Sequence, residues 1–245
     1  MNPLVAVLRF RRIEDRDRGH PFVPHAVPPK AFARCLSWLR RNGWMVVDAE
    51  RFLEGLDDPG GLPERSALLT IDGSYRSFIR DALPILRAHA LPAVVFVPVH
   101  FIGRDAALES DSRPSPMCTL NDLRYLASQG ISVQSLGVSS RPFDTLSEPE
   151  REWEMMRSRQ ALEAALQRPV ELFAFPRGDP GPDPRASTET ARRCGYRAAF
   201  VCRGSVNHVT EADRFRLARV TVGPATDLSR PLALEGCSVP DRDRT

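Results

Sequence analysis

The chain is expected to fold as an α/β protein in which helices cover a parallel β-sheet. Short apolar runs alternate with amphipathic stretches along most of its 245 residues. Several of the apolar runs are continuous, which is typical of parallel strands buried on both faces. A hydrophobic content of 42% and a charged content of 27% are those of an ordinary globular protein. This pattern leaves open whether the sheet is open or closed into a barrel.

The first half of the chain contains three strand–helix units. The apolar run Leu4–Phe10 predicts a buried strand, and a Pro-rich loop over 14–29 separates it from a helix over 30–42, which Gly43 ends. Further strands are expected over 45–47, 67–71 and 93–98. A short helix over 49–56 and an amphipathic helix beginning at Phe78 lie between them.

The second half continues the alternation after a predicted loop over 104–117. Thr119 is expected to cap a helix over 120–128, and Ser147 with Glu150 forms a capping box for a long helix ending near residue 166. The remaining strands are predicted over 131–133, 170–175, 198–201 and 217–222, and a helix over 186–194. The pattern fades from Ala225, which predicts one domain over 1–225 and a partly frayed tail over 226–245.

Charge and cysteine content argue against several kinds of site and partner. The net charge is only +3, and the arginines are scattered except for Arg-Phe-Arg-Arg at 9–12, so they are interpreted as solvated surface and no nucleic-acid partner is expected. The five cysteines form no CxxC pair, which argues against a disulfide framework and a cysteine zinc site. The apolar run over 4–8 is too short for a signal peptide or a membrane span, so a cytoplasmic protein without a membrane partner is expected.

One segment carries recognisable chemistry, because its strand delivers Asp72 to the tight turn Gly73-Ser74-Tyr75. The segment resembles the first signature of the polysaccharide deacetylases, the NodB-homology family of carbohydrate esterases (family 4), which reads Thr-Phe-Asp-Asp-Gly-Tyr. The resemblance places Asp72 at the position of the family's catalytic base and Gly73 at that of a metal ligand. It also implies a distorted, incomplete (β/α) barrel with its site at the carboxyl ends of the strands.

A second segment, residues 134–142, resembles the family's Gly-Ser-His-Gly-Val-Thr-His-Arg-Pro without gaps. Leu136 and Ser140 stand where the two metal-binding histidines would be. Together with Gly73, they replace all three protein ligands of the family's divalent metal. A leucine has no donor atom and a neutral serine is a poor ligand, so no metal and no other cofactor is expected.

The histidines offer two other candidates for a polar role. His20 and His25, with Asp17, lie in one loop and contain suitable ligand atoms, but a solvated charged loop is the favoured interpretation, because Arg16 and Arg18 flank Asp17. His100 follows the strand over 93–98 on the side where a barrel keeps its site. It is the best single histidine candidate, although a lone histidine at a strand end is more often structural.

Two later segments complete the resemblance. Residues 173–179 resemble the family's Phe-Ala-Tyr-Pro-Tyr-Gly-Asp, which implies that the amide of Arg177 can bind an oxyanion, while its side chain either binds an anion or faces solvent. Residues 215–220 resemble Arg-Leu-Pro-Arg-Ile, which implies that Arg219 pairs with Asp72 and keeps it ionised. Phe10-Arg11 replaces the family's Tyr-His, and no Leu-x-His near the carboxyl end supplies a general acid.

These departures lead to three functional hypotheses. The favoured one is a non-hydrolytic pseudoenzyme that binds a carbohydrate, a related ligand or a partner. The alternative is a metal-independent enzyme in which Asp72, oriented by Arg219, acts as acid or base, and the third is a residual N-deacetylase. A serine hydrolase is disfavoured, since no base and no Gly-x-Ser-x-Gly elbow is present. The candidate ligand-binding residues are Ser74, Tyr75, His100, Ser139, Ser140 and Arg177. The sequence does not indicate an oligomeric state.

Overall fold

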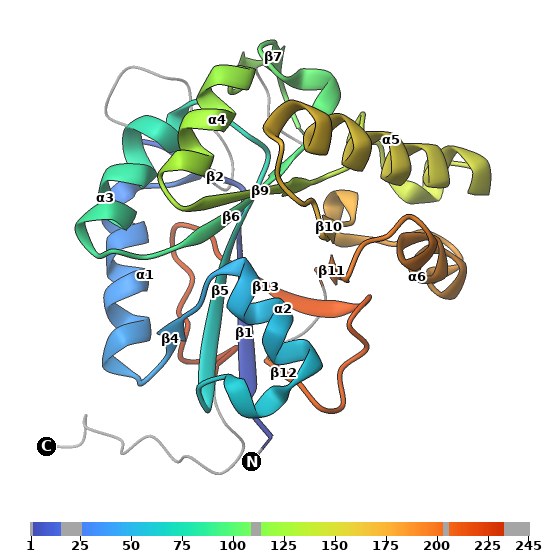
Figure 1. Cartoon of the computed structure of the whole chain (residues 1–245). Helices are drawn as coiled ribbons and strands as arrows, with labels where there is room; N and C mark the ends of the chain where they lie inside the picture. Colours follow the sequence, from blue (N-terminus) through green and yellow to red (C-terminus); the bar gives the residue numbers. More distant parts are fainter. Residues whose placement is uncertain (1, 16–25, 109–113, 203–205, 233–245) are drawn as a thin grey trace, which may run out of the picture.

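The computed structural model describes residues 2–15, 26–108, 114–202 and 206–232, and it has the predicted barrel architecture (Figure 1). Seven parallel strands form a closed ring in the order β1-β13-β11-β10-β9-β6-β5, and β5 pairs back onto β1. The ring strands are β1 (Leu4–Phe10), β5 (Arg65–Asp72), β6 (Ala93–Val97), β9 (Ile131–Ser135), β10 (Leu172–Ala174), β11 (Ala198–Val201) and β13 (Leu217–Thr221). Two short strands, β4 (Met45–Val46) and β12 (Asn207–His208), extend the sheet beside β5 and β1.

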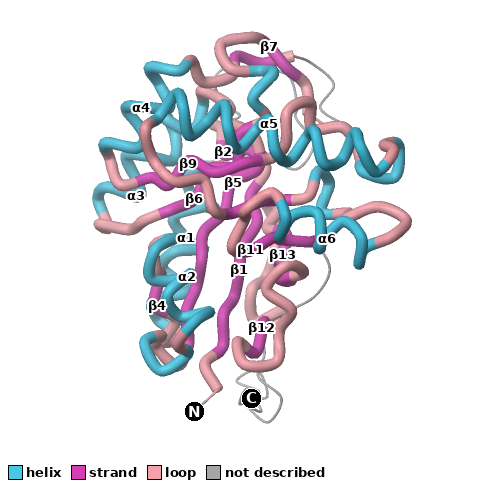
Figure 2. The backbone as a smooth tube through the Cα atoms, turned by 45° about the vertical axis from the view of Figure 1, so that its right-hand side comes forward, coloured by secondary structure: helices cyan, strands magenta, loops and turns pink. Residues whose placement is uncertain are grey.

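Helices surround the strands in both views of the chain (Figures 1 and 2). They are α1 (Pro29–Arg41), α2 (Ala49–Asp57), α3 (Leu83–Ala88), α4 (Leu120–Ser128), α5 (Glu148–Leu166) and α6 (Pro184–Arg193). The capping boxes expected at Thr119 and Ser147 are both present. Short 3-10 turns are η2 (Pro59–Gly61), η4 (Val99–Phe101), η5 (Phe143–Thr145) and η6 (Pro176–Gly178). No helix in the described ranges combines the length and the apolarity that a membrane span requires.

Strand alternation produces two separate apolar cores. On β1, Val5 and Val7 belong to a cluster with Phe96 and Phe200 that fills the barrel. The intervening side chains, such as Leu8, belong to a second cluster that packs the barrel against the helices. Because successive side chains of a strand point to opposite faces, residue parity decides which ones reach the barrel interior.

The amphipathic helix predicted after Asp72 is divided into two pieces. Phe78–Ala82 forms a π-helical turn, η3, and regular α-helix begins only with α3. Pro84 lacks an amide hydrogen, and its ring would collide with the carbonyl four residues earlier in a continuous α-helix. The wider turn avoids this collision.

Two other segments differ from the simplest expectation. The predicted loop over 104–117 contains a small antiparallel pair, β7 (Asp105–Ala106) with β8 (Ser115–Pro116), and a parallel pair, β2 (Arg12–Ile13) with β3 (Ala26–Val27), lies beyond the end of β1. At the carboxyl end, Leu228 and Leu232 are buried in the outer core. Packing therefore continues past residue 225. Residues 233–245 lie outside the described part of the chain, so the predicted domain boundary at residue 225 stays a prediction.

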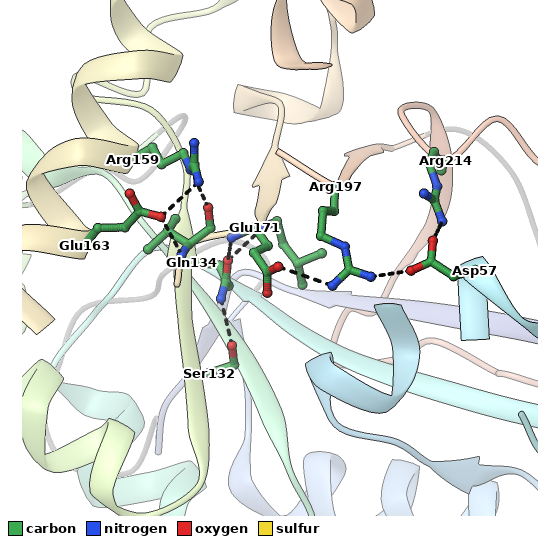
Figure 3. A network of polar contacts seen from close by, with 10 residues as sticks. Asp57, Ser132, Gln134, Arg159, Glu163, Glu171, Arg197 and Arg214 are labelled. Atoms are coloured by element: carbon green, nitrogen blue, oxygen red, sulfur yellow. Dashed lines mark hydrogen bonds and ion pairs between the residues drawn. The ribbon is translucent and has the colours of Figure 1, made fainter. Parts of the chain in front are cut away.

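Strands β9 and β10 share the shortest pairing in the ring, because a single residue pair, Phe173 with Ser135, joins them. The side chain of Gln134 supplements that pairing. Its Oε1 accepts hydrogen bonds from the amides of Glu171 and Leu172, each at 2.8 Å, while its Nε2 donates to Ser132 (Figure 3). Beside it, Arg197 bridges Glu171 and Asp57, which ties α2 to the amino ends of the strands.

Replacing Gln134 with methionine should weaken the contact between β9 and β10. The change keeps the side-chain size but leaves the buried amide of Leu172 and the partly buried amide of Glu171 without an acceptor, so the free energy of unfolding should fall by about 2 kcal/mol. Urea denaturation of Gln134→Met measures this loss. The matched control Gln160→Met, on the exposed side of α5, should stay within about 0.5 kcal/mol of the parent. Equal stability of the two variants would show that this contact does not depend on Gln134.

Candidate functional site

Asp72 ends β5 inside the carboxyl end of the barrel, where two arginines bind its carboxylate. Nη1 of Arg219 donates to Oδ1 at 2.6 Å, and Nη2 of Arg219 donates to Oδ2 at 3.0 Å. Nε of Arg9 donates to Oδ2 at 2.6 Å. The exposed fractions of Asp72, Arg9 and Arg219 are 5%, 5% and 1%, so the cluster is buried. The expected pairing of Asp72 with Arg219 is therefore present, and Arg9 joins it.

The strand order explains this arrangement. β1 lies between β5 and β13, and its residue Arg9 aligns with Thr70 on one side and Thr221 on the other. Arg9 has the same parity as Val5 and Val7, which face the barrel interior. The ends of three neighbouring parallel strands thus bring one carboxylate and two guanidinium groups together.

The two arginines control the ionisation of Asp72. Burial alone raises the pKa of this carboxyl, but the charges of Arg219 and Arg9, reinforced by their hydrogen bonds, outweigh burial and lower the pKa below its ordinary value. Both carboxylate oxygens already accept charged hydrogen bonds. Asp72 is thereby kept as an anion and is protonated only at a lower pH than an ordinary aspartate.

Arg9 is a residue of this cluster that the sequence interpretation missed. The Arg-Phe-Arg-Arg stretch was expected to be solvated surface, and this is wrong for Arg9 and Arg12, both of which are 5% exposed. Arg12 pairs with Glu14 and lies over the ring of Tyr75. An arginine at an inward position of a buried strand was the available signal, because such a charge is seldom buried unless it is paired.

The three positions that hold metal in the resembled family are unsuited to a metal here. Gly73 has a φ of +88°, and a side chain at this residue would place its Cβ 2.8 Å from Cδ1 of Leu108. Leu136 is buried within the apolar interior of the barrel. Ser140 has a φ of +56° and is half-buried. Across the described ranges, no group of three His, Cys, Asp or Glu side chains could hold a metal ion, whereas Asp17, His20 and His25 lie outside those ranges.

Ser139 is turned toward α5. Its hydroxyl donates to Glu154, and the amides of Val138 and Ser139 also donate to the buried carboxylate of Glu154, at 2.6 and 2.9 Å. Glu154 thus fixes the loop that follows β9. Ser139 and Ser140 are both half-buried, but the hydroxyl of Ser139 is already used in this contact.

Ser74 and Tyr75 are buried beneath the loop that follows the η4 turn. The hydroxyl of Tyr75 accepts a hydrogen bond from the amide of Leu108 at 3.0 Å. Ser74 is 1% exposed, and its hydroxyl has no hydrogen-bond partner within the described part of the chain. Nε of Arg219 is a second buried polar atom without a partner in that part.

His100 lies in the η4 turn and Arg177 in the η6 turn, at the same end of the barrel, and both side chains are exposed. His100 contacts Arg104 through Nε2, and its amide donates to the carbonyl of Val138, which brings the loops after β6 and β9 together. Arg177 has a φ of +58°, next to Gly178, which packs closely on Cys202. Cys202 in turn accepts a hydrogen bond from Nη2 of Arg219 at 3.5 Å. No pattern in the sequence pointed to Cys202 as a residue of the site.

Comparison with known proteins identifies the family. A family model described as polysaccharide deacetylase matches residues 60–199. The chain belongs to the polysaccharide deacetylase family. It is 23% identical over 202 residues to the Bacillus subtilis (strain 168) protein YxkH, which bears a polysaccharide deacetylase name, and 33% identical over 93 residues to the poly-beta-1,6-N-acetyl-D-glucosamine N-deacetylase of Escherichia coli K12. These matches cover 81% and 38% of this chain, but only 66% and 13% of the two relatives.

Solved structures show the same fold. The Streptococcus pyogenes deacetylase PplD in complex with acetate superimposes with a TM-score of 0.78 at 18% identity, covering 92% of this chain and 95% of PplD. IcaB from Ammonifex degensii superimposes with a TM-score of 0.76 at 24% identity, covering 90% and 92% of the two chains. The predicted NodB-type barrel is confirmed.

The Asp72 cluster should make stability depend on pH in a defined direction. A carboxyl whose pKa is lowered by folding stabilises the protein above the pKa of its unfolded form, about 3.9, and this contribution is lost as the pH falls through the folded-state pKa. Asp72→Asn should therefore lower the free energy of unfolding by about 3 kcal/mol at pH 7, because two buried guanidinium groups lose their carboxylate.

Urea denaturation between pH 7 and pH 3 measures how far the free energies of unfolding of the parent and of Asp72→Asn differ. This difference in free energy should stay constant down to about pH 4 and become smaller only in more acidic solution. The matched control Asp105→Asn, at an exposed position, should show little difference at any pH. A difference that grows on acidification would contradict the assigned sign of the pKa shift.

Proposed function

We propose that this protein is a polysaccharide deacetylase-like pseudoenzyme that binds a carbohydrate or a related ligand without hydrolysing it. The proposal rests on the side chains at the barrel mouth, which is the carboxyl end of the barrel around Asp72. Both oxygens of Asp72 bind arginines, and the three metal-ligand positions hold Gly73, Leu136 and Ser140. The three residues that bind the family's metal are replaced, and the retained aspartate at the catalytic-base position, Asp72, is bound by two arginines, whereas the barrel that surrounds them is intact.

Unused polar atoms at the mouth support a binding role. The hydroxyl of Ser74 and Nε of Arg219 are buried and lack partners within the described part of the chain. Such atoms carry a free-energy cost of about 1–3 kcal/mol each. Both residues are only 1% exposed, so a ligand removes this cost only if the side chains that cover them move aside. Ser140, Arg177 and His100 are the candidate contacts from the surrounding loops, while Tyr75 and Ser139 support the loops. A carbohydrate fits this set and matches the N-acetylglucosamine polymer named for one relative. A protein partner at the mouth is the second class of ligand.

A metal-independent enzyme remains the alternative. The pair Asp72–Arg219 is retained at the position where the resembled family keeps its catalytic base, which favours this hypothesis. The lowered pKa of Asp72 argues against it, because a general base works best when its pKa lies near the working pH. Residual N-deacetylation ranks third, since the loss of metal activation removes several kcal/mol of transition-state stabilisation.

The domain assignment 1–225 and a cytoplasmic location are retained as parts of this proposal. The first rests on the fading of the strand–helix pattern after residue 225.

A combined binding and turnover assay separates the three hypotheses. The protein is titrated with fully N-acetylated chito-oligosaccharide by calorimetry, and acetate release is measured with and without added Zn²⁺. The proposal expects saturable binding, no acetate in either condition, and weaker binding by Arg177→Ala but not by the control Arg185→Ala, an exposed arginine on α6.

Each other outcome favours a different hypothesis. Acetate release that requires zinc would show that the family's reaction persists. Zinc-independent release that disappears in Asp72→Asn would favour the alternative enzyme. Absence of any binding would exclude this carbohydrate class and direct attention to a protein partner.

A further inference from the structure

A cavity of about 370 Å³ lies on the outside of the barrel, between the end of α1, strand β4 and the turn after α3. Its size falls within the range of small-molecule sites. It is remote from the mouth, because β4 pairs with Ser66 and Ala67 near the start of β5, whereas Asp72 ends that strand. Six residues of extended chain separate Ser66 from Asp72 by about 20 Å.

The lining of this cavity is mainly apolar. Leu36 and Trp44 are 3% and 5% exposed, and Val46 and Leu91 are partly buried against the outer core. Met45 is 51% exposed, although it is a large apolar side chain. A flexible thioether beside an indole ring adapts well to an aromatic or acyl group. The cavity therefore suits the apolar body of a ligand.

Its polar groups are positively charged or neutral. Arg40 and His89 are exposed and line the cavity together with Ser37, and no carboxylate does so. Neither Arg40 nor His89 takes part in an ion pair within the described part of the chain. Two other cavities differ in this respect. The one of about 560 Å³ at the amino ends of the strands is lined by Asp48, Glu50, Glu54 and Glu171, and the one of about 500 Å³ by Asp144, Asp179 and Asp213.

We propose that the cavity between α1, β4 and α3 binds a small organic anion that has an acyl or aromatic body and a single carboxylate. The body packs on Leu36, Trp44 and Leu91, and the carboxylate pairs with Arg40. A carboxylate gains a charge-assisted hydrogen bond from the guanidinium, which a neutral head group does not. The site is independent of the barrel mouth, and the proposal does not rest on the proposed function.

Decanoate is a suitable probe, with 1-decanol as its neutral counterpart. Calorimetry and tryptophan fluorescence of the full chain should show saturable binding of one decanoate per chain, with 1-decanol binding about tenfold more weakly. Arg40→Glu should weaken decanoate binding by a similar factor. The control Arg34→Glu reverses an exposed charge on the same helix outside the cavity and should bind like the parent.

A second variant tests the location without changing charge. Ser37→Phe fills the cavity from an exposed helical position and should abolish binding, and the two residues have similar helix propensities. An unchanged melting temperature verifies that this variant folds. Absence of saturable decanoate binding, equal affinity for decanoate and 1-decanol, equal effects of the Arg34 and Arg40 variants, or full binding by folded Ser37→Phe would each overturn the proposal.

Discussion

The buried carboxylate of Asp72 and its two arginines form the interaction on which the barrel mouth depends. Asp72, Arg9 and Arg219 come from three neighbouring strands, so their hydrogen bonds join the strands where the ring closes between β1 and β5. A buried charge is costly unless it is paired, and removal of one partner leaves the others uncompensated. The cluster therefore fixes the ends of β1, β5 and β13 in one arrangement. The same bonds keep Asp72 ionised and use both of its carboxylate oxygens.

The mouth combines an intact family scaffold with a changed set of side chains. Glu154 of α5 holds the loop after β9 by hydrogen bonds to two consecutive amides, although this loop carries no histidine. Gly73 takes a backbone conformation with a φ of +88°, which an aspartate side chain would adopt only with strain, and Leu108 occupies the space beside it. At two of the three metal-ligand positions, Gly73 and Leu136, apolar packing thus takes the place of a ligand.

Local patterns predicted much of the fold, and long-range contacts explain what they missed. Helix α4 matches its predicted bounds because Thr119 and Asp122 mark its start chemically, and β1 and β11 match because each is a bounded apolar run. The Asp72–Arg219 pair followed from two family motifs. Arg9 was missed because its role depends on the strand order, and the hydrogen bond from Ser139 to Glu154 depends on how α5 packs against a loop. Neither relation is contained in a short stretch of sequence.

The central claim is that the mouth of this barrel does not bind the family's divalent metal. Anomalous diffraction from crystals grown with excess Zn²⁺, collected on both sides of the zinc absorption edge, tests it most directly. The account predicts no anomalous peak within about 2.5 Å of Asp72 or Ser140, since a zinc ligand atom lies about 2.0–2.3 Å from the ion. A strong peak bonded to the Asp72 carboxylate, with Arg9 or Arg219 displaced from it, would contradict the account.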